Sequence, residues 1–131
     1  AQLCQLLVEG QAVVDRGDFL GYKRFDQEFH RLIVQASGNG RLIRVFEMMH
    51  DQFQMVRSQA VRLPGRPGLG HKEHQQIAAA LAAGQCEEAE RLLSYHIRHT
   101  VEDVCRYLTD SSATAKADNT AERTAAAAAS E

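Results

Sequence analysis

Histidine is frequent in this sequence, and its imidazole ring can bind metal ions or transfer protons near neutral pH. The six histidines are His30, His50, His71, His74, His96 and His99. One of them, His30, follows Asp26 by four residues, so on a helix the two side chains share one face, about one turn apart. An imidazole and a carboxylate placed in this way can bind one divalent metal ion or form a simple hydrogen bond.

Four side chains fall on the buried faces of three predicted helices. They are Asp26 and His30 on one helix, His74 on a second and His96 on a third. A buried charge or polar group without a partner is unfavourable, so these side chains need one. Because neutral imidazole and carboxylate are usual ligands of Zn²⁺, we predict a divalent metal site. Zn²⁺ is the first candidate, Ni²⁺ and Mn²⁺ are alternatives, and open positions would hold water or a ligand carboxylate.

The same spacing also has simpler explanations. An aspartate and a histidine four residues apart often share only a hydrogen bond, and a histidine on an apolar face is often a hydrogen-bonded core residue. His71 and His99 lie three residues from His74 and His96, and they could assist or replace those two ligands. Glu73, which precedes His74, is predicted to be exposed to solvent.

Two further residues are candidates for binding an anion beside the metal ion. Arg57 has no acidic residue four positions away, so its guanidinium either points to solvent or pairs with an anion near the ion. Asn39 precedes a predicted helix, and the free N–H groups at a helix N-terminus attract anions. We therefore include both residues in the predicted ligand-binding site.

These residues must be positioned by helices, and the pattern of apolar residues predicts five helices. Apolar residues recur at steps of three and four, the helical period, over residues 1–16, 19–37, 40–62, 71–83 and 87–108. Asp18 and Asn39 are predicted to cap the second and third helices. Residues 63–70 hold both prolines and three glycines, so a loop is predicted there. The short connection at Gly84 makes the last two helices antiparallel neighbours, and the predicted fold is an all-α antiparallel bundle.

Composition excludes several classes of protein. The chain has 131 residues, of which 44% are hydrophobic and 24% charged, as in an ordinary globular domain. No apolar run approaches the roughly 20 residues of a membrane helix, and we expect no contact with membranes. The net charge of −2 does not favour nucleic-acid binding by this segment itself. We expect a cytoplasmic protein.

The cysteines do not suggest a disulfide framework. Cys4, Cys86 and Cys105 are odd in number and widely spaced, which fits reduced thiols that are buried as small apolar residues.

From residue 110 onward, alanine is the only apolar residue. We therefore divide the chain into a helical bundle over residues 1–109 and an Ala-rich low-complexity tail over residues 110–131, to which we assign no function.

Two blocks of this sequence resemble a known family. The segment from Phe25 to Asn39, FDQEFHRLIVQASGN, resembles the D-x-x-F-H…A-S-G-N signature of the FCD domain. The second block, which includes Glu73-His74 and His96, also follows the family's pattern. The FCD domain is the C-terminal effector-binding domain of the FadR subgroup of GntR transcription regulators. The usual Gly-Asp before the last helix is Gly84-Gln85 here, which is a departure from that pattern.

The resemblance implies a specific function. Many FCD domains bind a divalent metal through one aspartate and three histidines, which here correspond to Asp26, His30, His74 and His96. Small carboxylates such as hydroxy acids, sugar acids and dicarboxylates bind beside that metal as effectors. The domain also mediates homodimer formation, and an N-terminal winged helix-turn-helix binds DNA. We expect that winged domain, and the first helix of the bundle, to be absent from this chain.

Two other functions remain compatible with the same residues. A metal-dependent hydrolase would use the four ligands to activate water, and it would need a general base such as Glu28 or Glu73. A plain interaction bundle would hold hydrogen-bonded core histidines and bind no metal. Binding of metals and small carboxylates separates these alternatives from the sensor.

Overall fold

The computed structural model is a bundle of six helices in the part of the chain that it describes. It describes the backbone of residues 2–128 and the side chains of residues 2–111. The helices are α1 (Gln2–Asp15), α2 (Phe19–Ala36), α3 (Gly40–Met48), α4 (His50–Ala60), α5 (Arg66–Ala82) and α6 (Cys86–Ala128). No strand occurs among these residues, so the predicted all-α fold is confirmed.

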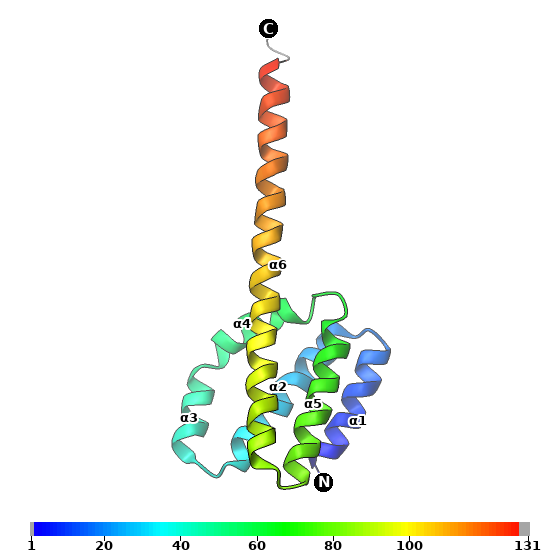
Figure 1. Ribbon diagram of the computed structural model, residues 1–131, viewed down its shortest axis with the longest axis vertical. Coiled ribbons are helices and arrows are strands. Elements are labelled where there is room, and N and C mark those ends of the chain that lie inside the picture. The colour runs from blue at the N-terminus through cyan, green and yellow to red at the C-terminus, as the bar shows by residue number, and fades with distance from the viewer. Residues whose placement is uncertain (1, 129–131) are drawn as a thin grey trace.

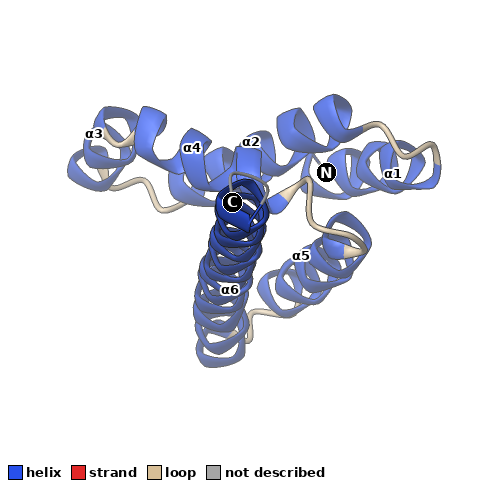
Figure 2. Ribbon diagram, turned by 90° about the horizontal axis from the view of Figure 1, so that it is seen from above, coloured by secondary structure: helices blue, strands red, loops and turns tan. Residues whose placement is uncertain are grey.

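The helices form two layers (Figure 2). The row of α1, α2 and α4 lies on one side, and α5 and α6 lie across from it, antiparallel to each other. Beyond the bundle, α6 projects as a single long helix (Figure 1). Among the described residues we find no helical stretch that combines the length and hydropathy needed to traverse a lipid bilayer.

Local sequence explains where several helices begin. Asp18 caps α2, because its carboxylate accepts a hydrogen bond of 2.8 Å from the backbone N–H of Gly21. The preceding residue, Gly17, has φ +63°, a conformation that favours glycine. Asn39 caps α3 by accepting hydrogen bonds from the backbone N–H groups of Arg41 and Leu42 at 3.1 and 3.2 Å. Both predicted caps are confirmed.

Three predicted helix boundaries are wrong. The helix predicted over residues 40–62 is two helices, separated at Met49, which has φ −89° and ψ 10°. The loop predicted over residues 63–70 instead contains the first turn of α5. Gly65 provides the left-handed entry at φ +75°, and Pro67 lies in the first turn, where its missing N–H breaks no helical hydrogen bond.

The third error concerns the end of α6. The apolar pattern predicts an end near residue 108, but α6 continues to Ala128. No glycine or proline occurs between these positions, and alanine has the highest helix propensity, so nothing in the backbone ends the helix. Side chains beyond residue 111 lie outside the described residues, and the division at residue 110 stays a prediction.

The core lies where α2 packs against α1 and α5. Phe29 and Ile77 are almost fully buried, and Phe25 lies directly against α1 at Gly10. A Cβ atom on Gly10 would stand 2.5 Å from the Phe25 ring, so a glycine permits this close packing. The prediction that Cys4, Cys86 and Cys105 are buried is wrong, because all three are exposed. Their side chains lie on helix faces that do not contribute to this core.

Candidate metal centre

The four predicted ligands come together from three helices. Asp26 and His30 lie one turn apart on α2, His74 lies on α5 and His96 lies on α6. One ligand atom from each residue lies within 4.8 Å of all the others. Asp26, His74 and His96 are buried, and His30 is nearly so. The cluster is therefore an interior feature and not a chance grouping of surface charges.

The separations between the ligand atoms fit a single ion. His96 Nε2 lies 3.2 Å from His74 Nε2 and 3.3 Å from His30 Nε2. Asp26 Oδ1 lies 3.5 Å from His74 Nε2 and 3.8 Å from His30 Nε2. Ligands bound at 2.0–2.2 Å to one divalent ion are roughly 3 to 4 Å apart. The donor set of three imidazoles and one carboxylate is also typical of such sites.

Hydrogen bonding identifies which nitrogen of His96 faces the cluster. Its Nδ1 lies 2.6 Å from Glu73 Oε2, and an ionised carboxylate only accepts hydrogen bonds. Nδ1 therefore carries the proton, and the lone pair of Nε2 faces His30 and His74. One lone pair cannot accept good hydrogen bonds from both rings, whereas a metal ion accepts all three nitrogens. A carboxylate behind a histidine ligand is the usual arrangement at metal sites.

The burial of Glu73 and its contact with His96 are what sequence reasoning missed. Glu73 was predicted to be exposed, but only 6% of it is accessible, and it also accepts hydrogen bonds from Arg66 at 3.2 and 2.9 Å. Burial alone would raise its pKa, but the hydrogen bonds from His96 and Arg66 outweigh burial and hold the pKa at about 2. Two signals were available, the Glu73-His74 pair in the family's pattern and Arg66, which lies two turns before Glu73 on the same face of α5.

Burial sets the charge of the other ligands. It lowers the pKa of His30 and of His74 well below 6.5, and nearby positive charge lowers both further. Both rings are therefore neutral at pH 7 and offer lone pairs to a metal. Burial raises the pKa of Asp26, whereas Arg57 lowers it through an ion pair of 2.9 Å between Nε and Oδ2.

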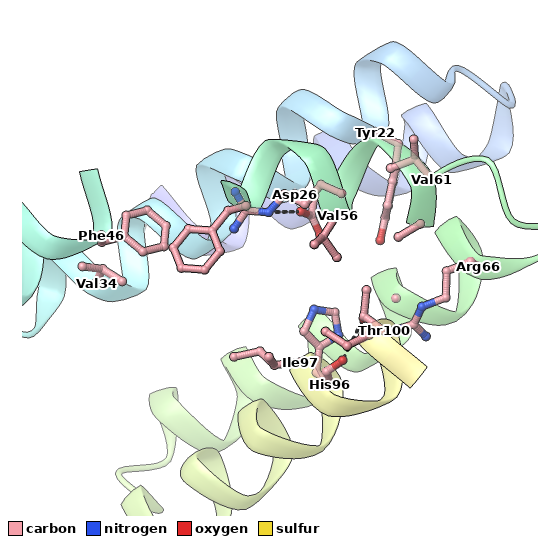
Figure 3. A pocket seen from close by; sticks show the side chains of 15 residues that line it. Tyr22, Asp26, Val34, Phe46, Val56, Val61, Arg66, His96, Ile97 and Thr100 are labelled. Atoms are coloured by element: carbon pink, nitrogen blue, oxygen red, sulfur yellow. Dashed lines mark hydrogen bonds and ion pairs between the residues drawn. The ribbon is translucent and has the colours of Figure 1, made fainter. Parts of the chain in front are cut away.

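A cavity of about 360 Å³ lies beside the cluster (Figure 3). Asp26 and His96 line it from opposite sides, and Arg57 lines it from α4. One of the two predicted placements of Arg57, pointing to solvent, is wrong. Its guanidinium carbon instead lies 6.0 and 5.7 Å from the ring centres of Phe46 and Phe53, and its Nε pairs with Asp26.

The other candidate residues lie outside the cluster. Asn39 is exposed at the start of α3 and does not line this cavity, so its role in ligand binding stays a prediction. His71 is buried but contacts Phe25 and Gln75. His99 lies behind the cluster, with its Nδ1 3.2 Å from Glu73 Oε1. Neither of these histidines replaces a ligand.

Comparison with known proteins gives one match. The family model described as the FCD domain matches residues 1–99, a range that contains all four clustered residues. No curated protein and no solved structure matches the chain.

Proposed function

The chain belongs to the FCD domain family, the regulatory effector-binding domains of GntR-type regulators, and from this we propose that it senses a small carboxylate through a bound divalent metal. Asp26, His30, His74 and His96 would hold the ion, with Zn²⁺ as the first candidate. One observation carries this proposal. Four metal-ligand atoms from three helices converge at the wall of a cavity that is large enough for a small molecule.

The residues around the centre each have a distinct role in this proposal. Glu73 orients His96 and fixes its tautomer. Arg57 holds Asp26 in place and offers its other N–H groups to an anion in the cavity. When bound, the divalent ion would supply a Lewis-acidic centre that accepts a carboxylate oxygen.

Sensing requires that the ligand stabilise one arrangement of the helices over another. A ligand in the cavity would touch α2, α4 and α6 together, because residues of all three helices line it. It changes DNA affinity only as far as it binds the two arrangements differently. In this proposal the chain forms a homodimer within a FadR-type regulator, and a separate winged helix-turn-helix contacts DNA.

The hydrolase alternative lacks an available general base. Glu73 is occupied by His96, His99 and Arg66, and Glu28 is exposed and paired with Arg31 on the surface of α2. Neither lines the cavity. A family of regulatory domains also favours sensing over catalysis.

Metal stoichiometry tests the proposal directly. The chelator-stripped chain should take up one Zn²⁺ ion per chain, measured by elemental analysis and by titration calorimetry. His74→Ala should abolish tight uptake, because this side chain is a ligand with no exposed surface. His50→Ala is the matched control, since His50 begins α4 outside the cluster. A wild-type chain that refolds and binds no divalent ion would overturn the proposal.

A further inference from the structure

The cavity beside the candidate metal centre is apolar along most of its wall. Eight of its fifteen lining residues have side chains that contain only carbon and hydrogen. Figure 3 shows Val34 and Phe46 at one end of the cavity, with Asp26 and His96 nearer its middle. Phe53 extends this apolar end, because its ring centre lies 5.3 Å from that of Phe46. One end of the cavity wall is therefore apolar, and the candidate metal ligands lie beyond that end.

Two polar residues of the wall, Arg66 and Thr100, already have hydrogen-bond partners within the protein. Arg66 donates to Glu73 at 3.2 and 2.9 Å, and it also contacts Thr100. Thr100 in turn donates its hydroxyl to the His96 carbonyl at 2.7 Å. A ligand hydroxyl buried against the apolar end, which Val34, Phe46 and Phe53 form, would lose its hydrogen bonds to water without replacing them. A polyhydroxylated acid is therefore a poor match.

A carboxylate, in contrast, has a partner next to the apolar end. The guanidinium of Arg57 lies over the rings of Phe46 and Phe53 while its Nε contacts Asp26 Oδ2. A guanidinium has five N–H donors, so contact with one carboxylate oxygen leaves others for a ligand. A negative group that meets Arg57 from within the cavity would place the rest of its molecule against apolar side chains.

The size of the cavity limits the ligand. About 360 Å³ is near the lower end of the range for small-molecule sites. At about 30 Å³ for each water-sized group, it holds about 12 non-hydrogen atoms. Long acyl chains and nucleotides are therefore too large to be enclosed by this cavity.

From this distribution of groups we infer that the ligand is a monocarboxylic acid with an apolar body of about eight or nine non-hydrogen atoms. Its carboxylate would face Arg57 and the metal ligands, and its body would lie along Val34, Phe46 and Ile97. Sugar acids would be excluded. This inference rests on the proposed function, because it narrows the class of carboxylate that the same site would bind.

Three probes of similar size test the inference on the zinc-loaded chain by titration calorimetry. 3-Phenylpropanoate has the charge and the apolar body, 3-phenylpropanamide has the body alone, and gluconate has the charge with a hydroxylated body. We expect the first probe to bind at least about tenfold more tightly than either of the others.

Each of the other outcomes contradicts a different part of the inferred ligand chemistry. Equal or tighter binding of gluconate overturns the apolar body but leaves carboxylate sensing intact. Equal binding of the amide overturns the role of the carboxylate. A chain that binds zinc but none of the acids overturns this inference together with carboxylate sensing. A chain that takes up no zinc overturns the proposed metal centre itself.

Substitutions in the wall locate the binding site. Val34→Asp adds a negative charge at the apolar end and should weaken 3-phenylpropanoate binding by about tenfold or more, with zinc stoichiometry unchanged. Val8→Asp is the matched control, because Val8 is exposed on α1. If Val34→Asp does not fold, Ile97→Asn serves instead, since Ile97 lines the cavity and is 51% exposed. Unchanged binding in the folded variant overturns the inference.

Discussion

The two parts of the molecule that border the cavity are packed very differently. The helix α5 buries eight of its residues, whereas α3 buries none and α4 buries only Ala60. The candidate metal ligands come from α2, α5 and α6, while residues 40–60, which we name the α3–α4 arm, form one wall of the cavity. The site therefore joins a tightly held centre to a wall with few buried contacts.

This difference suits a sensor. Metal coordination requires ligand atoms held within a fraction of an ångström, which packed helices provide. A wall with few buried apolar contacts opens at a lower free-energy cost, so it adapts more readily to a ligand. An ion pair between Arg57 and Asp26 connects the two parts. A ligand that contacts Arg57 would therefore act on the α3–α4 arm directly and on the centre through Asp26.

The largest expected contrast comes from two phenylalanines. Phe29→Ala empties a fully buried position in the centre and should lower the free energy of unfolding by about 3–5 kcal/mol. Phe46→Ala removes a half-buried ring from the α3–α4 arm and should cost about 1–2 kcal/mol. Urea unfolding of the two variants measures both values. Equal costs would show that the arm is packed as firmly as the centre.

Zn²⁺ binding should also stabilise the packed centre more than the α3–α4 arm. At free Zn²⁺ one hundred times its dissociation constant, binding should stabilise the chain by about 2.7 kcal/mol. Hydrogen exchange should slow in α2, α5 and α6, which hold the ligands, and change little in α3. Protection that is uniform, or confined to α3, would contradict the division into two parts.

Glu73→Gln tests the support behind the metal ligand. The variant keeps the size of the side chain but loses the charge that accepts the His96 hydrogen bond, so Zn²⁺ affinity should fall about 10- to 100-fold. Titration calorimetry measures this change. Glu28→Gln is the control, because Glu28 forms an exposed ion pair with Arg31. Equal affinities in the two variants would argue that Glu73 has no positioning role.

Acid should destabilise the metal-free centre. The pKa values of His30 and His74 are lowered by burial, so the unfolded chain binds more protons than the folded one. Their contribution to stability is complete above the unfolded pKa of about 6.5 and is lost as the pH falls below it. The free energy of unfolding should fall by roughly 1 kcal/mol between pH 7 and pH 6.

The control for this experiment is His50→Gln, which should retain the same dependence on pH, since His50 lies outside the cluster. Stability that rises between pH 7 and pH 6 would mean that the two buried rings are protonated in the folded chain.

The smallest expected effect is on the α3–α4 arm. Asn39→Ala removes the cap of α3 and should cost roughly 0.5 kcal/mol, at the low end for capping residues, because α3 buries no side chain. Zn²⁺ affinity should not change. A large loss of Zn²⁺ or carboxylate binding would show instead that Asn39 belongs to the ligand site.

Local spacing was sufficient to predict an all-α fold and the inward faces of the four candidate ligands, but not every helix boundary. Asp26, His30, His74 and His96 each lie three or four residues from an apolar neighbour, and this places them on inward faces whatever the arrangement of the helices. Asp18 and Asn39 were predictable as caps for the same reason, since a cap depends on the next three residues alone.

The tertiary structure decided the partners of those residues. Arg57 contacts Asp26 across 31 positions of sequence, and Glu73 contacts His96 across 23, and no local pattern encodes which helices become neighbours. The burial of Glu73 follows only from the packing of α5 against α6. Helix periodicity identifies which side chains face inward, whereas the electrostatics of a site depend on distances between helices, which only the folded chain sets.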